Sequence, residues 1–189
     1  MARRATKNSG AAVLALALAT CPFGVVGCGG GQTANEPPPG VSAIADTRTP
    51  IQFKYDSLDN RPVDSESTLG APTVIAFIAT WDLLSQAQVD FLVTMNKSDQ
   101  GRVHYLIVAL QEPKDRELVE VYVEHLGVEF PSALADPQTI AGGGPFGDVH
   151  NVPSVVVLDA EGKLVWLHPG LARSNDIRSA MHGGSTRAK

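Results

Sequence analysis

The chain has 189 residues and a formal net charge of −5, from 15 Lys and Arg against 20 Asp and Glu. This length fits one ordinary domain with additional segments at its ends. A hydrophobic content of 43% excludes a chain that is disordered over its whole length. The acidic balance argues against nucleic acid and anionic headgroups as partners, because binding to phosphates needs an excess of Lys and Arg.

The first residues have the pattern of an export signal. Residues 1–10 carry three basic and no acidic side chains, and residues 11–20 form an unbroken run of small and apolar residues. The run is shorter than the about 20 apolar residues that a membrane-spanning helix needs, and Pro22 interrupts any helix soon after it. We therefore predict a signal peptide over residues 1–27.

The segment Val25-Val26-Gly27-Cys28 resembles the lipobox of bacterial lipoproteins, in which the cysteine becomes the lipidated first residue. The resemblance implies a membrane anchor through a lipid on Cys28 and a location in the cell envelope, facing the periplasm or the exterior. Cys21 fits the pattern less well, because Thr20 is unusual before the modified cysteine. The alternative is an ordinary secreted protein that is cut elsewhere.

A stretch rich in Gly and Pro, with almost no large apolar side chain, comes next, at residues 28–50. Such a composition is typical of a flexible tether that has nothing to bury. We predict one globular domain over residues 51–182 and a disordered tail over residues 183–189.

The first half of this domain has the pattern of a βαβ unit. Residues 51–55 alternate as a half-exposed strand does, and residues 73–79 and 103–110 are continuous apolar runs, typical of strands buried on both faces. Between the two runs, a helix is predicted by apolar residues at three- and four-residue steps: Leu84, Ala87, Phe91, Leu92 and Met95. Strands joined by a helix in this way are parallel, which indicates an α/β fold.

The second half adds a helix, a hairpin and a last helix. The helix begins at Pro113, stops at Gly127, and carries an apolar face of Leu118, Tyr122 and Leu126. Residues 154–158 and 163–167 are strands separated by the turn sequence Asp159-Ala160-Glu161-Gly162, which predicts an antiparallel hairpin. A short final helix is predicted over residues 175–181.

This order of elements resembles the thioredoxin-like family, and within it the membrane-tethered thiol-disulfide oxidoreductases of bacterial envelopes. The resemblance also rests on Ala79-Thr80-Trp81 at the end of the first buried strand and on Val152-Pro153-Ser154 at the start of the hairpin. It implies a central mixed sheet flanked by helices, with one extra N-terminal strand. It also implies a cis-proline at Pro153, facing the redox site of the family.

The two cysteine positions of the family motif are occupied by Asp82 and Ser85 in this chain. Thiol exchange needs an attacking thiolate and a second, resolving thiol, and neither a carboxylate nor a hydroxyl replaces them. We therefore predict no catalytic residue and no cofactor. Asp82 suits the N-cap of the helix that begins after it, and the neighbouring groove, with Trp81 and Pro153 as its walls, is left as a binding surface.

A metal site is not predicted. The five histidines stand singly, at positions 104, 125, 150, 168 and 182, without the spacing that metal sites use. His150 has only Asp148 as a nearby candidate co-ligand.

Three functions agree with these patterns. The first is a redox-inactive binding or accessory module that takes an envelope protein or a peptide through the former active-site groove. The second is a thiol-disulfide oxidoreductase, or a peroxide-related redoxin, whose cysteines a partner supplies. The third is a purely structural component of the envelope. The missing cysteines favour the first function, in which the chain is not an enzyme.

Overall fold

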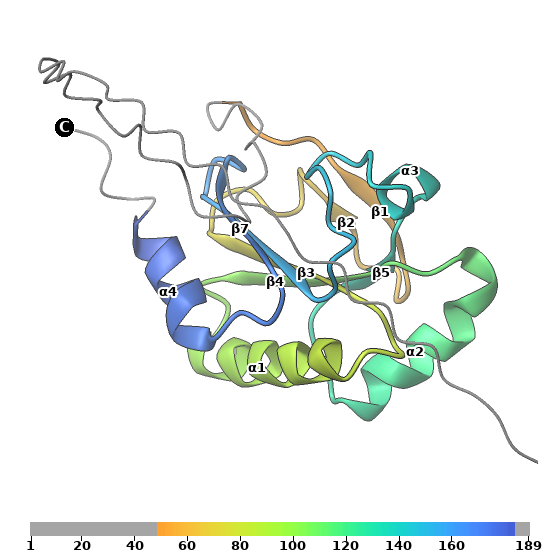
Figure 1. Ribbon diagram of the computed structural model, residues 1–189. Coiled ribbons are helices and arrows are strands. Elements are labelled where there is room, and N and C mark those ends of the chain that lie inside the picture. Colours follow the sequence, from red (N-terminus) through yellow and green to blue (C-terminus); the bar gives the residue numbers. More distant parts are fainter. Residues whose placement is uncertain (1–48, 184–189) are drawn as a thin grey trace, which may run out of the picture. The chain divides into compact units, whose positions relative to one another are not determined.

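A computed structural model describes residues 49–183 (Figure 1). The predicted signal peptide, Cys28, the tether up to residue 48 and the tail from residue 184 lie outside the described residues. Within residues 49–183, no helix is long and apolar enough to cross a bilayer.

Seven strands form a single mixed sheet in the order β2-β1-β5-β4-β3-β6-β7. The central strands β3, β4 and β5 are parallel, whereas β6 is antiparallel to β3 and β7, and β1 is antiparallel to β2 and β5. The strands span β1 (Lys54–Ser57), β2 (Val63–Asp64), β3 (Thr73–Ile78), β4 (His104–Ala109), β5 (Ser132–Leu134), β6 (Ser154–Leu158) and β7 (Leu164–Pro169). The predicted mixed sheet, the parallel βαβ unit and the antiparallel hairpin are confirmed.

The helices connect these strands. Helix α1 (Leu83–Asp99) joins β3 to β4, and the short 3₁₀ helix η1 (Pro113–Asp115) with α2 (Arg116–His125) joins β4 to β5. Helix α3 (Pro137–Ile140) comes after β5, and α4 (Ser174–Gly183) comes after β7. In Figure 1, α1, α2 and α4 lie on one side of the sheet, whereas α3 lies towards its other side.

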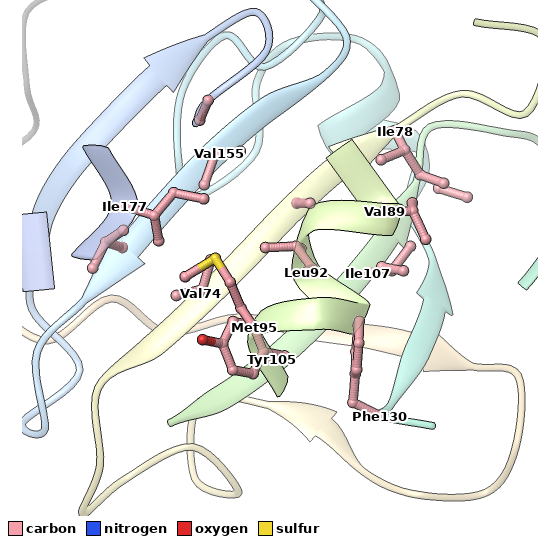
Figure 2. Close-up of a cluster of buried hydrophobic side chains, with 14 of the residues drawn as sticks. Val74, Ile78, Val89, Leu92, Met95, Tyr105, Ile107, Phe130, Val155 and Ile177 are labelled. Carbon is pink, nitrogen blue, oxygen red and sulfur yellow. The ribbon is translucent and has the colours of Figure 1, made fainter. Parts of the chain in front are cut away.

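The core has two layers, one on each face of β3. Figure 2 shows the layer under the helices, where Leu92 and Met95 of α1 lie against Val74 of β3 and Tyr105 of β4. On the opposite face, Phe77 packs against Phe146 and other aromatic side chains. All six residues of β3 are buried, as its continuous apolar run predicts. Each large apolar side chain buried in this way contributes about 1.5–3 kcal/mol.

The first strand differs from its prediction, because it begins at Lys54 rather than at Ile51. Pairing with β2 starts only where Lys54 lies opposite Asp64. The residues before it keep the alternation of burial, and Ile51 donates its N–H to the carbonyl of Gly162 at 2.9 Å. Strands β2 and β5 and helix α3 are additional elements that the sequence patterns did not predict.

The predicted apolar faces of two helices are partly wrong. In α1, Leu84 is exposed, whereas the polar side chains of Ser85 and Gln88 are fully buried. In α2, Leu118 is exposed and Val119 is buried. The physical reason in α1 is that the buried polar groups accept hydrogen bonds from the backbone, as Gln88 Oε1 does from the N–H of Ala172 at 2.8 Å. In α2, Val119 packs in the core layer under the helices, and Tyr122 and Leu126 of the predicted face pack against that layer partly buried.

Candidate functional site at the N-terminus of helix α1

The chain leaves β3 at Ile78, turns, and enters α1 through Asp82. Asp82 is the N-cap of the helix, with extended backbone angles (φ −101°, ψ 123°). Its Oδ2 accepts a hydrogen bond from the N–H of Ser85 at 2.6 Å. A carboxylate is stabilised at this place because the first N–H groups of a helix have no partner within the helix and the helix dipole is positive here.

Ser85 lies in the first turn of α1 and is fully buried. Its Oγ accepts a hydrogen bond from the N–H of Ala79 at 3.2 Å, so the hydroxyl holds the end of β3 to the start of α1. The N–H of Thr80 donates to Oε1 of the buried Gln111 at 3.1 Å, which ties the same turn to the end of β4. The side chains of Asp82 and Ser85 are therefore part of the hydrogen bonding that shapes this turn.

Pro153 lies at the same end of the sheet as this turn. The Val152–Pro153 peptide bond is cis. Ser154, the next residue, pairs with Phe77 in the β3–β6 ladder, which places Pro153 beside the end of β3. The carbonyl of Pro153 accepts a hydrogen bond from the N–H of Gly170 at 2.7 Å, so the residue directly after β7 fixes its position from the other side.

Three large apolar side chains around Asp82 face the solvent. Trp81 is 72% exposed, Leu83 is 81% exposed and Leu84 is 51% exposed. We call Trp81, Leu83 and Leu84 the apolar cluster. Within the described residues, none of the cavities of 390, 340 and 430 Å³ is lined by Trp81 or Pro153, so the structure offers a surface at this place and not one of these pockets.

Tyr122 of α2 is within electrostatic reach of Asp82. Burial raises the pKa of Tyr122 to about 12, and the negative charges of Asp90 and Asp82 add to the effect. Within residues 49–183, its buried hydroxyl has no hydrogen-bond partner. The electrostatic effect of Asp82 on Tyr122 and the hydrogen bond between Thr80 and Gln111 were not predicted from the sequence. The sequence feature that could have indicated a role for Gln111 is its position, as a polar residue soon after the buried run of β4.

His150 is the histidine for which the sequence offered a candidate co-ligand. His150 Nδ1 is 2.8 Å from Asp148 Oδ1, so the two predicted neighbours do meet. A group of three or more His, Cys, Asp and Glu side chains that could hold a metal ion does not occur between residues 49 and 183.

Comparison with known proteins rests on structure. No protein-family model and no curated protein matches this chain. A thiol:disulfide interchange protein of the thioredoxin family from Chlorobium tepidum is similar, with 21% identity, a TM-score of 0.61, and coverage of 71% of this chain and 93% of its own. A DsbF homologue from Corynebacterium diphtheriae has 17% identity, a TM-score of 0.64, and coverage of 78% and 96%.

A secreted disulfide oxidoreductase from Mycobacterium tuberculosis is also similar, with 20% identity, a TM-score of 0.55, and coverage of 71% of this chain and 99% of its own. At such low sequence identities, structural similarity supports a shared fold and not a shared activity. Together with the order of the seven strands and the helices that flank them, they show that this chain has the thioredoxin-like fold.

Proposed function

We propose that this chain is a redox-inactive, polypeptide-binding module of the bacterial cell envelope, held at the membrane by a lipid on Cys28. The observation that carries the binding function is the exposure of Trp81, Leu83 and Leu84 around the N-cap of α1. In oxidoreductases of this fold, this is where the reactive cysteines lie. The chain keeps the surface around the position and lacks the thiols.

Redox inactivity follows from the groups at the two positions. Asp82 and Ser85 have no sulfur, and both side chains take part in hydrogen bonds that hold the turn before α1. The two cysteines of the chain are Cys21 and Cys28, and both precede the domain. Since thiol exchange proceeds through a thiolate, the domain has no group of its own that could attack a disulfide.

The apolar cluster is unusual for a surface without a partner. Large apolar side chains that face the solvent together mark places where another molecule binds, and Trp is enriched among the residues that dominate binding energy. Burial of such side chains in a complex is worth about 1.5–3 kcal/mol each, before the entropy of association is subtracted. A polypeptide with apolar side chains is the partner class that this surface fits best.

Capture from detergent-solubilised envelope tests the binding function, with the full lipid-anchored chain as bait. We expect the wild type to retain a specific polypeptide and the double variant Trp81→Ala, Leu83→Ser to lose it. Val121→Ser is the matched control, because Val121 is a similarly exposed apolar residue (58%) on α2 outside the cluster. The binding function is contradicted if the wild type retains nothing specific, or if the double variant retains as much as the control.

Metabolic labelling with a fatty-acid analogue tests the anchor. We expect the wild type and Cys21→Ala to incorporate the label and Cys28→Ala to remain unlabelled. Label that persists in Cys28→Ala and disappears in Cys21→Ala would place the lipid on Cys21. A wild type without label would contradict the lipid anchor altogether, and leave the binding function to be judged by the capture experiment.

A further inference from the structure

The segment between α3 and β6, residues 141–153, is held to the end of α3 by the side chain of His150, which lies near the C-terminal end of the segment. The imidazole of His150 lies between a carboxylate and a backbone carbonyl. Its Nδ1 is 2.8 Å from Oδ1 of Asp148, and its Nε2 is 2.5 Å from the carbonyl oxygen of Ile140, the last residue of α3. The ring therefore closes a loop from α3 to a point three residues before Pro153.

Both neighbours of the ring are hydrogen-bond acceptors. A neutral imidazole has one N–H and one lone pair, so it can donate to only one of the two, and the other nitrogen would point its lone pair at an oxygen. Only the imidazolium donates on both sides. The hydrogen bonds to Asp148 and to the Ile140 carbonyl, in that order, raise the pKa of His150 above its usual range, which agrees with this geometry.

Among residues 49–183, the charged side chain recorded against the ring is that of Asp148. Asp148, from the same segment, is the charged group that faces it, and its carboxylate also accepts the backbone N–H of His150 at 3.0 Å. Helix α3 contributes the uncharged carbonyl of Ile140, and the turn after α3 contributes the backbone of Gly142. The pKa of Asp148 is lowered by its hydrogen bonds to His150, first from the backbone N–H and then from the ring.

Gly142 is the residue that lets the ring come so close. A Cβ at this position would lie 2.5 Å from Cε1 of His150, and the backbone has a φ of +83°, which favours glycine. Gly147, in the same segment, has a similar φ of +76° but open space where its Cβ would be. Alanine at either position would strain the backbone, but only at Gly142 would its Cβ also meet the ring of His150.

We propose that His150 is a pH-operated latch that, as an imidazolium, ties the segment before Pro153 to the end of α3. When the ring loses a proton, Nδ1 keeps its hydrogen because it faces the carboxylate of Asp148. The lone pair of Nε2 then points at the carbonyl of Ile140, and that contact opens. The latch acts on the segment that leads to Pro153, and it exists whether or not the chain has a polypeptide partner.

The direction of the pH effect follows from linkage. A group whose pKa is raised in the folded state contributes stability that is complete below its unfolded pKa and is lost as the pH rises through the folded pKa. The segment is therefore closed on the acid side of the His150 titration and open on the alkaline side.

NMR on the full chain in detergent tests the latch. The readouts are the titration of the His150 ring and the hydrogen exchange of amides 142–152, corrected for the intrinsic pH dependence of exchange. In the wild type we expect a raised His150 pKa and several-fold slower exchange on the acid side. In Gly142→Ala we expect the His150 pKa to fall towards its ordinary value, with fast exchange at both pH values. Gly147→Ala is expected to keep both properties of the wild type.

His150→Gln separates the charge from the shape of the side chain. The glutamine amide can still donate one hydrogen bond but does not titrate, so we expect exchange of the segment to become independent of pH. Three results would each overturn the latch: an ordinary pKa for His150 in the wild type, a pH effect on exchange that survives in His150→Gln, or equal losses in Gly142→Ala and Gly147→Ala.

Discussion

The carboxylate of Asp82 accepts a hydrogen bond from the N–H of Ser85 at 2.6 Å, which joins the two positions at which the resemblance to the thioredoxin-like family predicts the thiol pair. The two residues are thus linked as the N-cap and the first turn of α1 rather than as reactive partners. The same helix N-terminus that would stabilise a thiolate here stabilises a carboxylate. The interaction of Asp82 with the helix therefore contributes to the stability of the domain.

Asp82→Ala should destabilise the domain, because it removes the side-chain cap of α1. We expect a loss of about 1 kcal/mol in the free energy of unfolding, with Asp82→Asn closer to the wild type, since asparagine also caps helices. Urea denaturation of the three proteins measures this. Asp90→Ala, on the exposed face of the same helix, is the control and should change stability by no more than about 0.5 kcal/mol.

Ser85→Ala should also destabilise, since it leaves the N–H of Ala79 without the acceptor that it has in the wild type. An unsatisfied buried donor costs about 1–3 kcal/mol. Thermal or urea unfolding gives the value. Ser179→Ala removes an exposed hydroxyl that donates to a carbonyl within α4, and an equal loss in that variant would show that burial of Ser85 has no special weight.

The sequence patterns predicted the central elements of the fold well, for a physical reason. Strands such as β3 are buried on both faces, so hydrophobicity alone marks them. The sequence patterns did not predict β5, because Ser132 and Ala133 are small and Pro131 is typical of a loop. This strand is set by its pairing with β4 and β1. Such pairing depends on contacts between segments far apart in the chain, which no local pattern records.

The candidate site was predicted in part. The capping role of Asp82 follows from its residue type and its place before a helical pattern, and the structure has Asp82 as the N-cap. The exposure of Leu84 did not follow, because an apolar residue at helical spacing was expected on the buried face. The buried place is taken by Ser85, whose hydroxyl has a backbone partner that only the folded chain provides.

Exposed and buried apolar residues at α1 should respond in opposite ways to truncation. Trp81→Ala should change the free energy of unfolding by no more than about 0.5 kcal/mol, because the indole is 72% exposed. Leu92→Ala, in the core, should cost about 2–5 kcal/mol. Chemical denaturation distinguishes the two. A large loss of stability in Trp81→Ala would mean that the indole has a structural role and that the apolar cluster is not free for a partner.

The fall in the free energy of unfolding at acidic pH should depend on Asp99, the last residue of α1. Burial acts to raise the pKa of this carboxyl, but hydrogen bonds from the Tyr105 hydroxyl (2.5 Å) and from the Arg178 guanidinium (2.8 Å) outweigh it and lower the pKa below its usual range. A lowered carboxyl pKa contributes stability above the unfolded pKa, and this contribution is lost as the pH falls through the folded pKa.

We therefore expect Asp99→Asn to be less stable than the wild type at neutral pH and to lose less stability on acidification. The deficit at neutral pH should be on the order of 1.5–3 kcal/mol, as for hydrogen bonds to a charged group. Free energies of unfolding measured across the acid range check this, with Asp90→Asn as an exposed carboxyl on the same helix. Parallel pH profiles for the wild type and Asp99→Asn would contradict the role of Asp99.

Disulfide reduction by the chain from Gly29 onwards, which lacks both native cysteines, tests the central claim most directly. The wild type is compared with a variant that carries both Asp82→Cys and Ser85→Cys, under the same conditions and with the same reductant. We predict no turnover by the wild type and measurable turnover by the double variant, since the N-terminus of α1 and the neighbouring cis-proline remain in place. Disulfide reduction by the wild type would contradict the claim that this domain is redox-inactive.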